Sequence, residues 1–401
     1  MVKKVLKSYD YSIVSVYILI SLFGLVMVYS ASMVTAIQLG QDSNFFYKKQ
    51  LINLLMSFVA FVVMSIIPYK LFKSNKMLVA IMLLSVVGLV SLNFIGNNVN
   101  NATSWISVGA RSIQPSEFVK LGMIIYLAAV YAKKQSYIND FNKGVAPPIL
   151  FLIFITFLTI VQPDLGTASI IFVTGLMMVL CSGMNWKNLL KLVMIGVIAV
   201  VIFSPIILLK SDDIFTEERM GRIYSFTDPF QYEVDEGHQL VNSYLAIGSG
   251  GWKGVGLGKS VQKLGYLPEA HTDFIMAIIA EELGIFGVGF VLVCLGYIVL
   301  KGFYIGMKCK DPFGSLLAFG ISGMLGFQTF INLGGASGMI PITGVTLPFV
   351  SYGGSSLLVL SLALGLLMNV AMFSNYEMKY KTEKSNTIKK EERFTRAPQV
   401  F

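Results

Sequence analysis

The chain has 401 residues, of which 55% are hydrophobic and only 13% are charged, and its mean hydropathy is +0.71. This balance excludes an ordinary water-soluble domain, because such domains carry about 25% charged residues. The formal net charge is +9, but the lysines and arginines lie in short clusters between apolar segments, so no nucleic-acid partner is indicated. The composition predicts an all-α polytopic membrane protein.

Apolar segments of membrane-spanning length recur along the whole chain. A helix rises about 1.5 Å per residue, so roughly 20 apolar residues cross the hydrocarbon layer. The predicted spans are residues 11–33, 49–67, 77–96, 115–132, 146–162, 165–183, 188–209, 273–300, 314–333 and 352–374. The first resembles a signal peptide but lacks a small-residue cleavage site, so we interpret it as a span. The sequence therefore predicts about ten transmembrane helices in a single domain, residues 1–375.

The distribution of basic residues predicts the orientation of these helices. Short cytoplasmic loops collect Lys and Arg, and alternate loops do so here, from Lys3, Lys4 and Lys7 at the N-terminus to the tail after Lys379. We expect a multi-pass protein of the cytoplasmic membrane with both termini cytoplasmic.

Three segments outside the spans have a distinct composition. Residues 210–272 form a large polar loop between the seventh and eighth spans, and we expect it to be extracytoplasmic and functional. Within it, IFTEERMGRIYSF predicts a short amphipathic helix. Residues 334–350 carry no charge and are rich in Gly and Pro, which favours a re-entrant segment buried in protein. Residues 376–401 mix Lys, Arg and Glu without periodicity, which predicts a disordered, basic cytoplasmic tail.

The stretch LPEAHTDFIMAIIAEELG, residues 267–284, places titratable residues at the start of an apolar run. Its polar beginning predicts a helix start with Thr272 or Asp273 as the N-cap. A carboxylate there is stabilised by free backbone N–H groups, and it can also accept a proton from a substrate hydroxyl. Asp273 is thus either a helix cap or a general base. His271 is either a hydrogen-bonding loop residue or part of a binding site.

Two further acids, Glu281 and Glu282, follow in the same helix, about 12 Å deeper than Asp273. Charged side chains are costly against lipid, so both should point into the bundle and find partners. We expect them to be structural buried charges.

A second cluster, SWISVGARSIQPSEFVK, brings Trp105 and Arg111 to the start of the fourth span. Glu117 and Lys120 are spaced i, i+3 and share a helix face, so they can neutralise each other. Alternatively, Lys120 and Arg111 receive an anion, because cationic donors match phosphate oxygens.

The glycine-rich stretch GVGLGKS, within the large loop, resembles a phosphate-binding P-loop only superficially. The first glycine of that motif would fall on Lys253, so nucleotide binding is not indicated. The three cysteines, Cys181, Cys294 and Cys309, are widely spaced and suggest neither disulfides nor a zinc site.

These stretches resemble the SEDS family (shape, elongation, division and sporulation), and within it the division-septum branch more than the elongation branch. The matching motifs are GLVMVYSAS, SWISVGARSIQPSEFVK, QPDLGTA, the stretch from AIGSGGWKG to IIAEELG, and GMIPITGVTLPFVSYGGSS. They run through nearly the whole chain in family order. Small departures fall at His238, Asn242 and Met276, and they affect loop detail only.

The resemblance implies a peptidoglycan polymerase that joins lipid II into β-1,4 glycan strands at the outer membrane face during cell division. It implies Asp273 as the catalytic residue and a class B penicillin-binding protein, among other division membrane proteins, as partner. Substrate contacts are expected from Trp105, Arg111, Glu117, Lys120, Arg222, Lys263 and His271. A divalent cation such as Mg²⁺ could assist, although no cluster has convincing ligand spacing.

Two other functions fit parts of the sequence. A lipid II flippase would use Glu117, Lys120, Glu281 and Glu282 as a polar route across the bilayer. A division-site scaffold without activity would fit the basic tail but leaves the membrane charges without a role.

Overall fold

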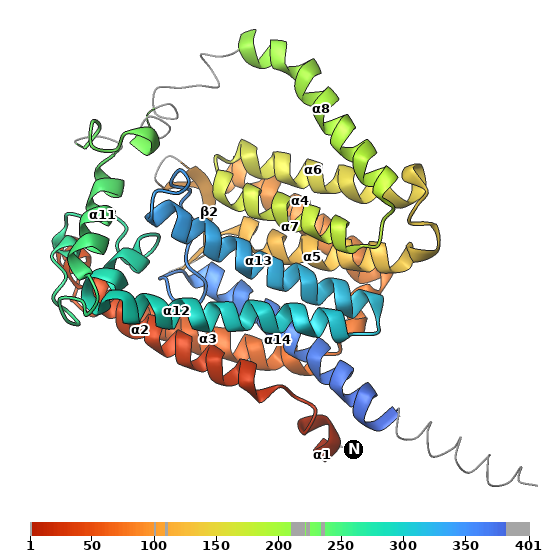
Figure 1. Ribbon diagram of the computed structural model, residues 1–401, viewed down its shortest axis with the longest axis horizontal. Coiled ribbons are helices and arrows are strands. Elements are labelled where there is room, and N and C mark those ends of the chain that lie inside the picture. Colours follow the sequence, from red (N-terminus) through yellow and green to blue (C-terminus); the bar gives the residue numbers. More distant parts are fainter. Residues whose placement is uncertain are drawn as a thin grey trace, which may run out of the picture.

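The computed structural model describes residues 2–99, 102–108, 111–209, 225–233 and 237–381, together with residue 221. The chain forms a bundle of long helices with a small antiparallel sheet near one end (Figure 1). The bundle helices are α2 (Tyr11–Gln38), α3 (Phe45–Ile66), α4 (Asn75–Ile95), α5 (Pro115–Lys133), α6 (Ala146–Val161), α7 (Leu165–Cys181), α8 (Trp186–Leu209), α12 (Ile275–Lys308), α13 (Pro312–Ala336) and α14 (Gly354–Tyr376). The shorter elements are α1 (Val2–Leu6), η1 (Tyr69–Lys73), η2 (Gln135–Tyr137), η3 (Phe141–Val145), α11 (His238–Gly250), η4 (Gln262–Leu264) and η5 (Glu377–Lys381).

Every span predicted above coincides with one of these bundle helices. Within the described residues, 8 helices are long and apolar enough to cross a membrane. Helix α7 is apolar but shorter, at 17 residues, and α8 has 24 residues. The prediction of an all-α polytopic membrane protein is confirmed.

Helix α14 lies at the centre of the bundle, where it is mostly buried and packs most extensively on α3. Helix α13 packs against α12, α5 and α7, while α2 packs against α3 and α12. Large apolar side chains are exposed around the outside of the bundle, as a surface that faces lipid requires. Helix α8 leans away from α6 and α7 (Figure 1).

The sheet was not part of the sequence prediction. Strand β1 (Asn97–Val99) pairs antiparallel with β2 (Ala102–Val108), which pairs antiparallel with β3 (Arg111–Ile113). The segment ATSWISV contains β-branched and aromatic residues in partial alternation with polar ones, which favours a short strand. The Ser104 hydroxyl donates to the Gln162 carbonyl oxygen at 3.1 Å, so the sheet is attached to the turn between α6 and α7.

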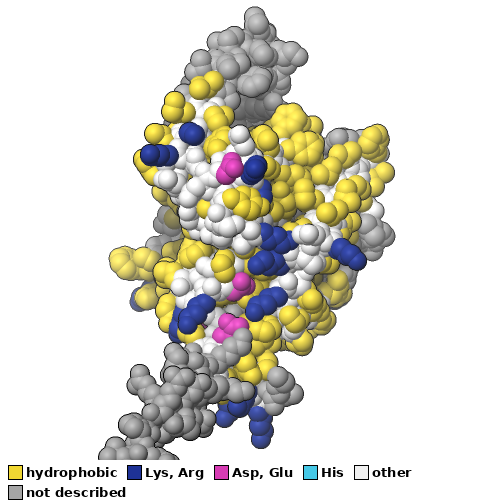
Figure 2. All heavy atoms as spheres, turned by 90° about the vertical axis from the view of Figure 1, so that its right-hand side faces the viewer, with side chains coloured by type: hydrophobic (Ala, Val, Ile, Leu, Met, Phe, Trp, Pro, Cys, Tyr) yellow, Lys and Arg dark blue, Asp and Glu magenta, His cyan; other side chains and the backbone are white. Residues whose placement is uncertain are grey.

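The two ends of the bundle differ in character. Helix α1, the α12–α13 junction and the end of α14 lie at one end, whereas α11 and the sheet lie at the other, here called the loop end (Figure 1). Figure 2 shows the first end, where Lys and Arg side chains gather among hydrophobic ones. Its exposed lysines include Lys70, Lys76, Lys133, Lys308 and Lys310, and we call it the basic end.

Residues 337–353, between α13 and α14, have no regular secondary structure, and we call them the 337–353 segment. Their apolar side chains Val345, Leu347, Phe349 and Val350 are nevertheless buried. Helix α2 crosses them closely, since a Cβ at Gly24 would lie 2.7 Å from the Phe349 carbonyl oxygen. Glycine at position 24 is what permits this approach. Irregular backbone inside a bundle of membrane helices is tolerated where protein surrounds it, as it does here.

Parts of two predicted regions fall outside the described residues. Most of the amphipathic helix expected in IFTEERMGRIYSF does so, as does the tail after residue 381. The start of the predicted disordered tail is instead a helical turn, η5, that continues α14. There the Tyr376 and Tyr380 rings are 5.2 Å apart, and the Lys4 ammonium lies 4.8 Å from the Tyr380 ring centre.

Candidate active site

Asp273 lies at the loop end, in a tight turn just before α12, and its side chain is half-buried. The prediction that Thr272 or Asp273 caps the helix is wrong: Phe274 holds the N-cap position, and no side chain bonds the free N–H groups there. The turn is instead closed by the Glu269 carbonyl, which accepts from the Thr272 and Phe274 amides at 3.1 and 3.3 Å. Glu269 adopts a φ of +52°, which is a strained conformation for a non-glycine residue.

Three successive carbonyls of this turn are held from neighbouring elements. The His271 oxygen accepts from the Tyr352 amide at 2.9 Å, the Thr272 oxygen from the Ser351 hydroxyl at 2.6 Å, and the Asp273 oxygen from the Asn332 side-chain amide at 2.8 Å. The backbone beneath the carboxylate is therefore fixed to the end of α13 and to the residues that precede α14.

The Asp273 carboxylate itself is left available. Within the described part of the chain no donor bonds it, and burial together with the nearby Glu269 carboxylate raises the pKa of Asp273 to about 7. Gly344 adjoins it, since a Cβ there would lie 3.7 Å from Asp273 Oδ2. A carboxyl group whose pKa lies near neutrality is well suited to accept a proton.

His271 is packed into an aromatic cluster. Its ring centre lies 4.6 Å from that of Phe46 and 5.6 Å from that of Tyr352. Its Nδ1 atom is buried and has no hydrogen-bond partner among the described residues. Burial lowers the pKa of His271 while Glu269 opposes that shift, so the ring is neutral at pH 7. In this structure His271 supports the turn from inside the protein.

Two amide side chains of α13 hold the 337–353 segment beside Asp273. Asn332 donates to the Val345 carbonyl at 2.7 Å as well as to the Asp273 carbonyl. Gln328, one turn earlier, donates to the Thr346 carbonyl at 3.1 Å and accepts from the Lys120 ammonium at 3.0 Å. Neither residue was predicted from the sequence as part of the site, although polar residues spaced i, i+4 in an apolar helix are a recognisable signal.

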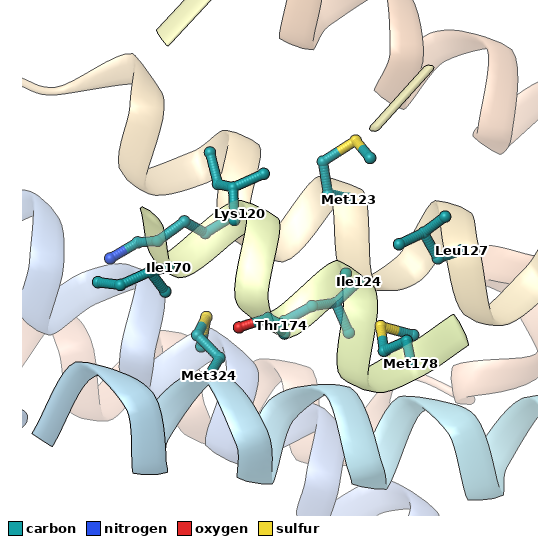
Figure 3. Close-up of a pocket in the computed structure, with 10 residues that line it drawn as sticks. Lys120, Met123, Ile124, Leu127, Ile170, Thr174, Met178 and Met324 are labelled. Carbon is teal, nitrogen blue, oxygen red and sulfur yellow. The ribbon is translucent and has the colours of Figure 1, made fainter. Parts of the chain in front are cut away.

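Lys120 and Glu117 form a buried ion pair at 2.9 Å. Lys120 is 2% exposed and Glu117 is 5% exposed. The two residues are therefore arranged as in the alternative in which they neutralise each other. Lys120 also lines a narrow cavity between α5, α7 and α13 with Met123, Ile124, Ile170, Thr174 and Met324 (Figure 3). The cavity has room for about one water molecule.

Lys263, Glu281 and Glu282 form a second buried group, joined by two serines. The Lys263 ammonium lies 2.6 Å from Glu282 Oε1 and donates to the Ser30 hydroxyl at 2.9 Å. Glu281 accepts from the Val261 amide at 2.8 Å and from the Ser260 hydroxyl. Both acids thus have partners in protein, and the Lys263 charge is matched.

The remaining site residues lie nearer the edge of the loop end. Trp105 is half-buried in β2, opposite Asn97. Arg111 pairs through its backbone with Val108 in the sheet, and its side chain is not described. Arg222 lies outside the described residues. Within the described part of the chain, no group of three or more His, Cys, Asp or Glu side chains is arranged to hold a metal ion.

Comparison with known proteins identifies the family to which this chain belongs. The family described as "Cell cycle protein", which covers FtsW, RodA and SpoVE, matches residues 10–376. A Bacillus subtilis protein described as "Probable peptidoglycan glycosyltransferase FtsW" is 56% identical over 385 residues, which cover 96% of each chain. Stage V sporulation protein E of the same organism is 38% identical over 92% of this chain and 98% of its own.

Solved structures of similar proteins have a similar fold. The crystal structure of RodA from Thermus thermophilus is 26% identical, with a TM-score of 0.61, and covers 90% of this chain and 96% of its own. A chain from a structure described as "Structural coordination of polymerization and crosslinking by a peptidoglycan synthase complex" is 25% identical, with a TM-score of 0.72, over 91% and 98%. The fold is that of a multi-pass membrane protein, and the matched family is one of cell-cycle proteins. The chain belongs to the SEDS family, the family of FtsW, RodA and SpoVE.

Proposed function

We propose that the protein is a peptidoglycan glycosyltransferase that polymerises lipid II at the outer face of the cytoplasmic membrane. The observation that carries this proposal is the Asp273 carboxylate: it is presented beside Gly344 with no bonded donor in the described residues, on a backbone fixed at three successive carbonyls. Family membership supplies the reaction class, and relatives described as peptidoglycan glycosyltransferases support it.

In this proposal Asp273 is the general base. Its carboxylate accepts the proton of the acceptor sugar's 4-hydroxyl, whose oxygen attacks the anomeric carbon of the donor from the face opposite the pyrophosphate. The bond to pyrophosphate breaks, and inversion of the α-linked donor gives a β-1,4 bond. One base suffices because pyrophosphate leaves without needing a proton, unlike the sugar oxygen that leaves in glycoside hydrolysis.

Cationic groups would stabilise the charge that develops on the leaving pyrophosphate. The Lys120 and Lys263 ammonium groups are already paired with Glu117 and Glu282, which disfavours both. Arg111, at the edge of the sheet, and Arg222 in the large loop are the remaining nominees. A divalent cation such as Mg²⁺ would serve the same purpose.

The orientation follows from the charges of the two ends. The basic end carries exposed lysines on several loops (Figure 2), and such loops stay in the cytoplasm. We infer that both termini are cytoplasmic and that Asp273 faces outward.

A class B penicillin-binding protein is the proposed partner. The similarity to a chain of a solved complex that coordinates polymerisation and crosslinking supports it. The higher identity to B. subtilis FtsW, 56%, than to stage V sporulation protein E, 38%, favours a role at the division septum over one in sporulation.

Purified protein with such a partner and labelled lipid II tests the reaction. Glycan strands of more than one disaccharide support the polymerase. Headgroup translocation without polymer would instead support a flippase. The absence of both polymer and translocation would support a scaffold.

A further inference from the structure

Two sets of polar contacts locate the two membrane boundaries on this structure. At the basic end, Lys301 forms an ion pair with Asp10 at 3.0 Å. Nearer the loop end, the Ser30 hydroxyl donates to Glu282 at 2.8 Å, and Glu282 is paired with Lys263. Both sets link α2 to α12 or to the loop beside it. The two levels are 20 positions apart along α2, from Asp10 to Ser30, and 19 positions apart along α12, from Glu282 to Lys301. This separation corresponds to about 30 Å, which matches the hydrocarbon thickness of a bilayer.

The exposure along α12 gives the same outer boundary. From Ile275 to Glu282 every residue is buried in protein. Ile285 and Phe286 are the first large apolar side chains of the helix that are exposed, the latter by 72%, and others follow at Leu292, Val293 and Leu300. Helix α12 therefore meets lipid only from about residue 285 onward.

The glycine-rich stretch Gly251–Ser260 is fastened to α12 at this level. The Val255 and Gly256 amides each donate at 2.9 Å to the Glu281 and Glu282 carbonyls, respectively. This is possible because α12 breaks at Gly284, where φ is +61°. The contact is so close that a Cβ at Gly284 would lie 2.5 Å from the Trp252 carbonyl oxygen.

The outward side of this stretch has the composition of a membrane interface. Trp252 is 75% exposed, and Val255 and Leu257 are also exposed, next to the exposed ammonium groups of Lys253 and Lys259. Tryptophan concentrates at the level of lipid headgroups, and lysine reaches their phosphates while its stem stays in apolar surroundings.

We propose that residues 251–259 lie in the headgroup layer of the outer leaflet and fix the depth of the protein in the membrane, with Trp252 and Leu257 as the inserted side chains. The inference does not depend on the reaction.

Tryptophan fluorescence tests the proposed depth. The chain has 3 tryptophans, so Trp105→Phe with Trp186→Phe leaves Trp252 as the only emitter. This variant is reconstituted into phosphatidylcholine and phosphatidylglycerol vesicles whose acyl chains are brominated either near the headgroup or near the methyl end. We expect stronger quenching by the shallow bromines than by the deep ones, with weak quenching by aqueous acrylamide.

Two matched controls bracket the result, each with Trp252→Phe in the same background. Phe286→Trp, on the lipid-facing side of α12, should respond to brominated lipid. Phe230→Trp, exposed before α11, should respond to acrylamide alone. Trp252 that behaves like Phe230→Trp would overturn the inference, because the stretch would then lie in water. Shielding from both quenchers would overturn it too, by showing protein over this surface.

If the single-tryptophan chain fails to fold, a nitroxide spin label on Leu257→Cys gives the same test in a chain whose natural cysteines are replaced. The measured quantity is the collision rate of the label with oxygen, compared with its collision rate with a water-soluble nickel chelate. Greater access to the chelate than to oxygen would contradict membrane seating. Loss of polymerisation leaves these readouts unchanged, so the two proposals fail separately.

Discussion

Gln328 and Asn332 lie one helical turn apart on α13, and both donate side-chain amide hydrogens to consecutive carbonyls of the 337–353 segment, those of Thr346 and Val345. Each also reaches a charged residue: Gln328 accepts from Lys120, and Asn332 donates to the backbone of Asp273. One helix face thus joins the buried ion pair of α5 to the proposed base.

The first prediction concerns the base. Asp273→Asn keeps the size and the backbone contacts of the residue but removes its ability to accept a proton. We expect polymerisation to fall by about 10²- to 10⁴-fold, with thermal stability unchanged or slightly raised because a buried charge is lost. Glycan synthesis from labelled lipid II measures the rate, and retained activity would remove the assignment. Asp164→Asn, which alters the cap of α7, controls for general effects of losing a carboxylate at the loop end.

The second prediction is the pH dependence. Because the pKa of Asp273 is raised to about 7, the basic form is half populated near pH 7 and grows as the pH rises. The rate should therefore increase through pH 7 and level off above it. Glu269→Gln removes a neighbouring negative charge, so the pKa should fall and the profile should move to lower pH. An unchanged profile in Glu269→Gln would contradict this account of the shift.

The third prediction tests whether the Asn332 side-chain amide on α13 positions Asp273. Asn332→Leu leaves the Asp273 and Val345 carbonyls without their donor, and each buried unpaired group costs about 1–3 kcal/mol. We expect a lower unfolding temperature and a fall in kcat larger than the change in KM, since the base is displaced. Asn369→Leu is the matched control, because Asn369 is equally buried and bonds the Ser65 carbonyl and the Tyr69 amide at the basic end. A similar fall in kcat for both variants would reduce Asn332 to a purely structural role.

The fourth prediction concerns Gly344, whose φ is +70°. Gly344→Ala forces a side chain into that conformation, at about 1–2 kcal/mol, and adds a methyl group 3.7 Å from Asp273 Oδ2. Gly183→Ala has a similar φ, +82°, with nothing within 4 Å of the added carbon. Both variants should lose similar stability, while only Gly344→Ala should lose polymerisation rate. Equal rates in the two would show that the methyl group does not reach the site.

The fifth prediction addresses the buried pair of Lys263 and Glu282. Lys263→Met leaves a buried carboxylate uncompensated, at about 3–5 kcal/mol, so the unfolding temperature should drop sharply. Adding Glu282→Met should recover much of the loss, because two apolar side chains then pack together. Unfolding followed by tryptophan fluorescence in detergent measures both variants. If the double variant is less stable than Lys263→Met, the pair has a role beyond neutralising charge.

The helices could be predicted because a membrane imposes one simple rule, a run of apolar residues long enough to cross it, and 8 of the described helices satisfy that rule. Asp273 was nominated as the catalytic residue because the resemblance to SEDS proteins singled out its motif. The surroundings of Asp273 could not be predicted in the same way, since Asn332, Gly344 and Ser351 come from segments whose contact depends on how α13 and α14 pack. Local patterns also misplaced the helix start, because the Glu269 carbonyl closes the turn that a capping side chain was expected to close.

The triple attachment of residues 271–273 has a mechanical consequence. Because the donors come from the last turns of α13 and from the entry into α14, a slide of either helix by one residue's rise, about 1.5 Å, would carry the carboxylate with it. Catalytic geometry is sensitive to displacements of that size. A force that displaced either helix would therefore lower the rate of the proposed reaction.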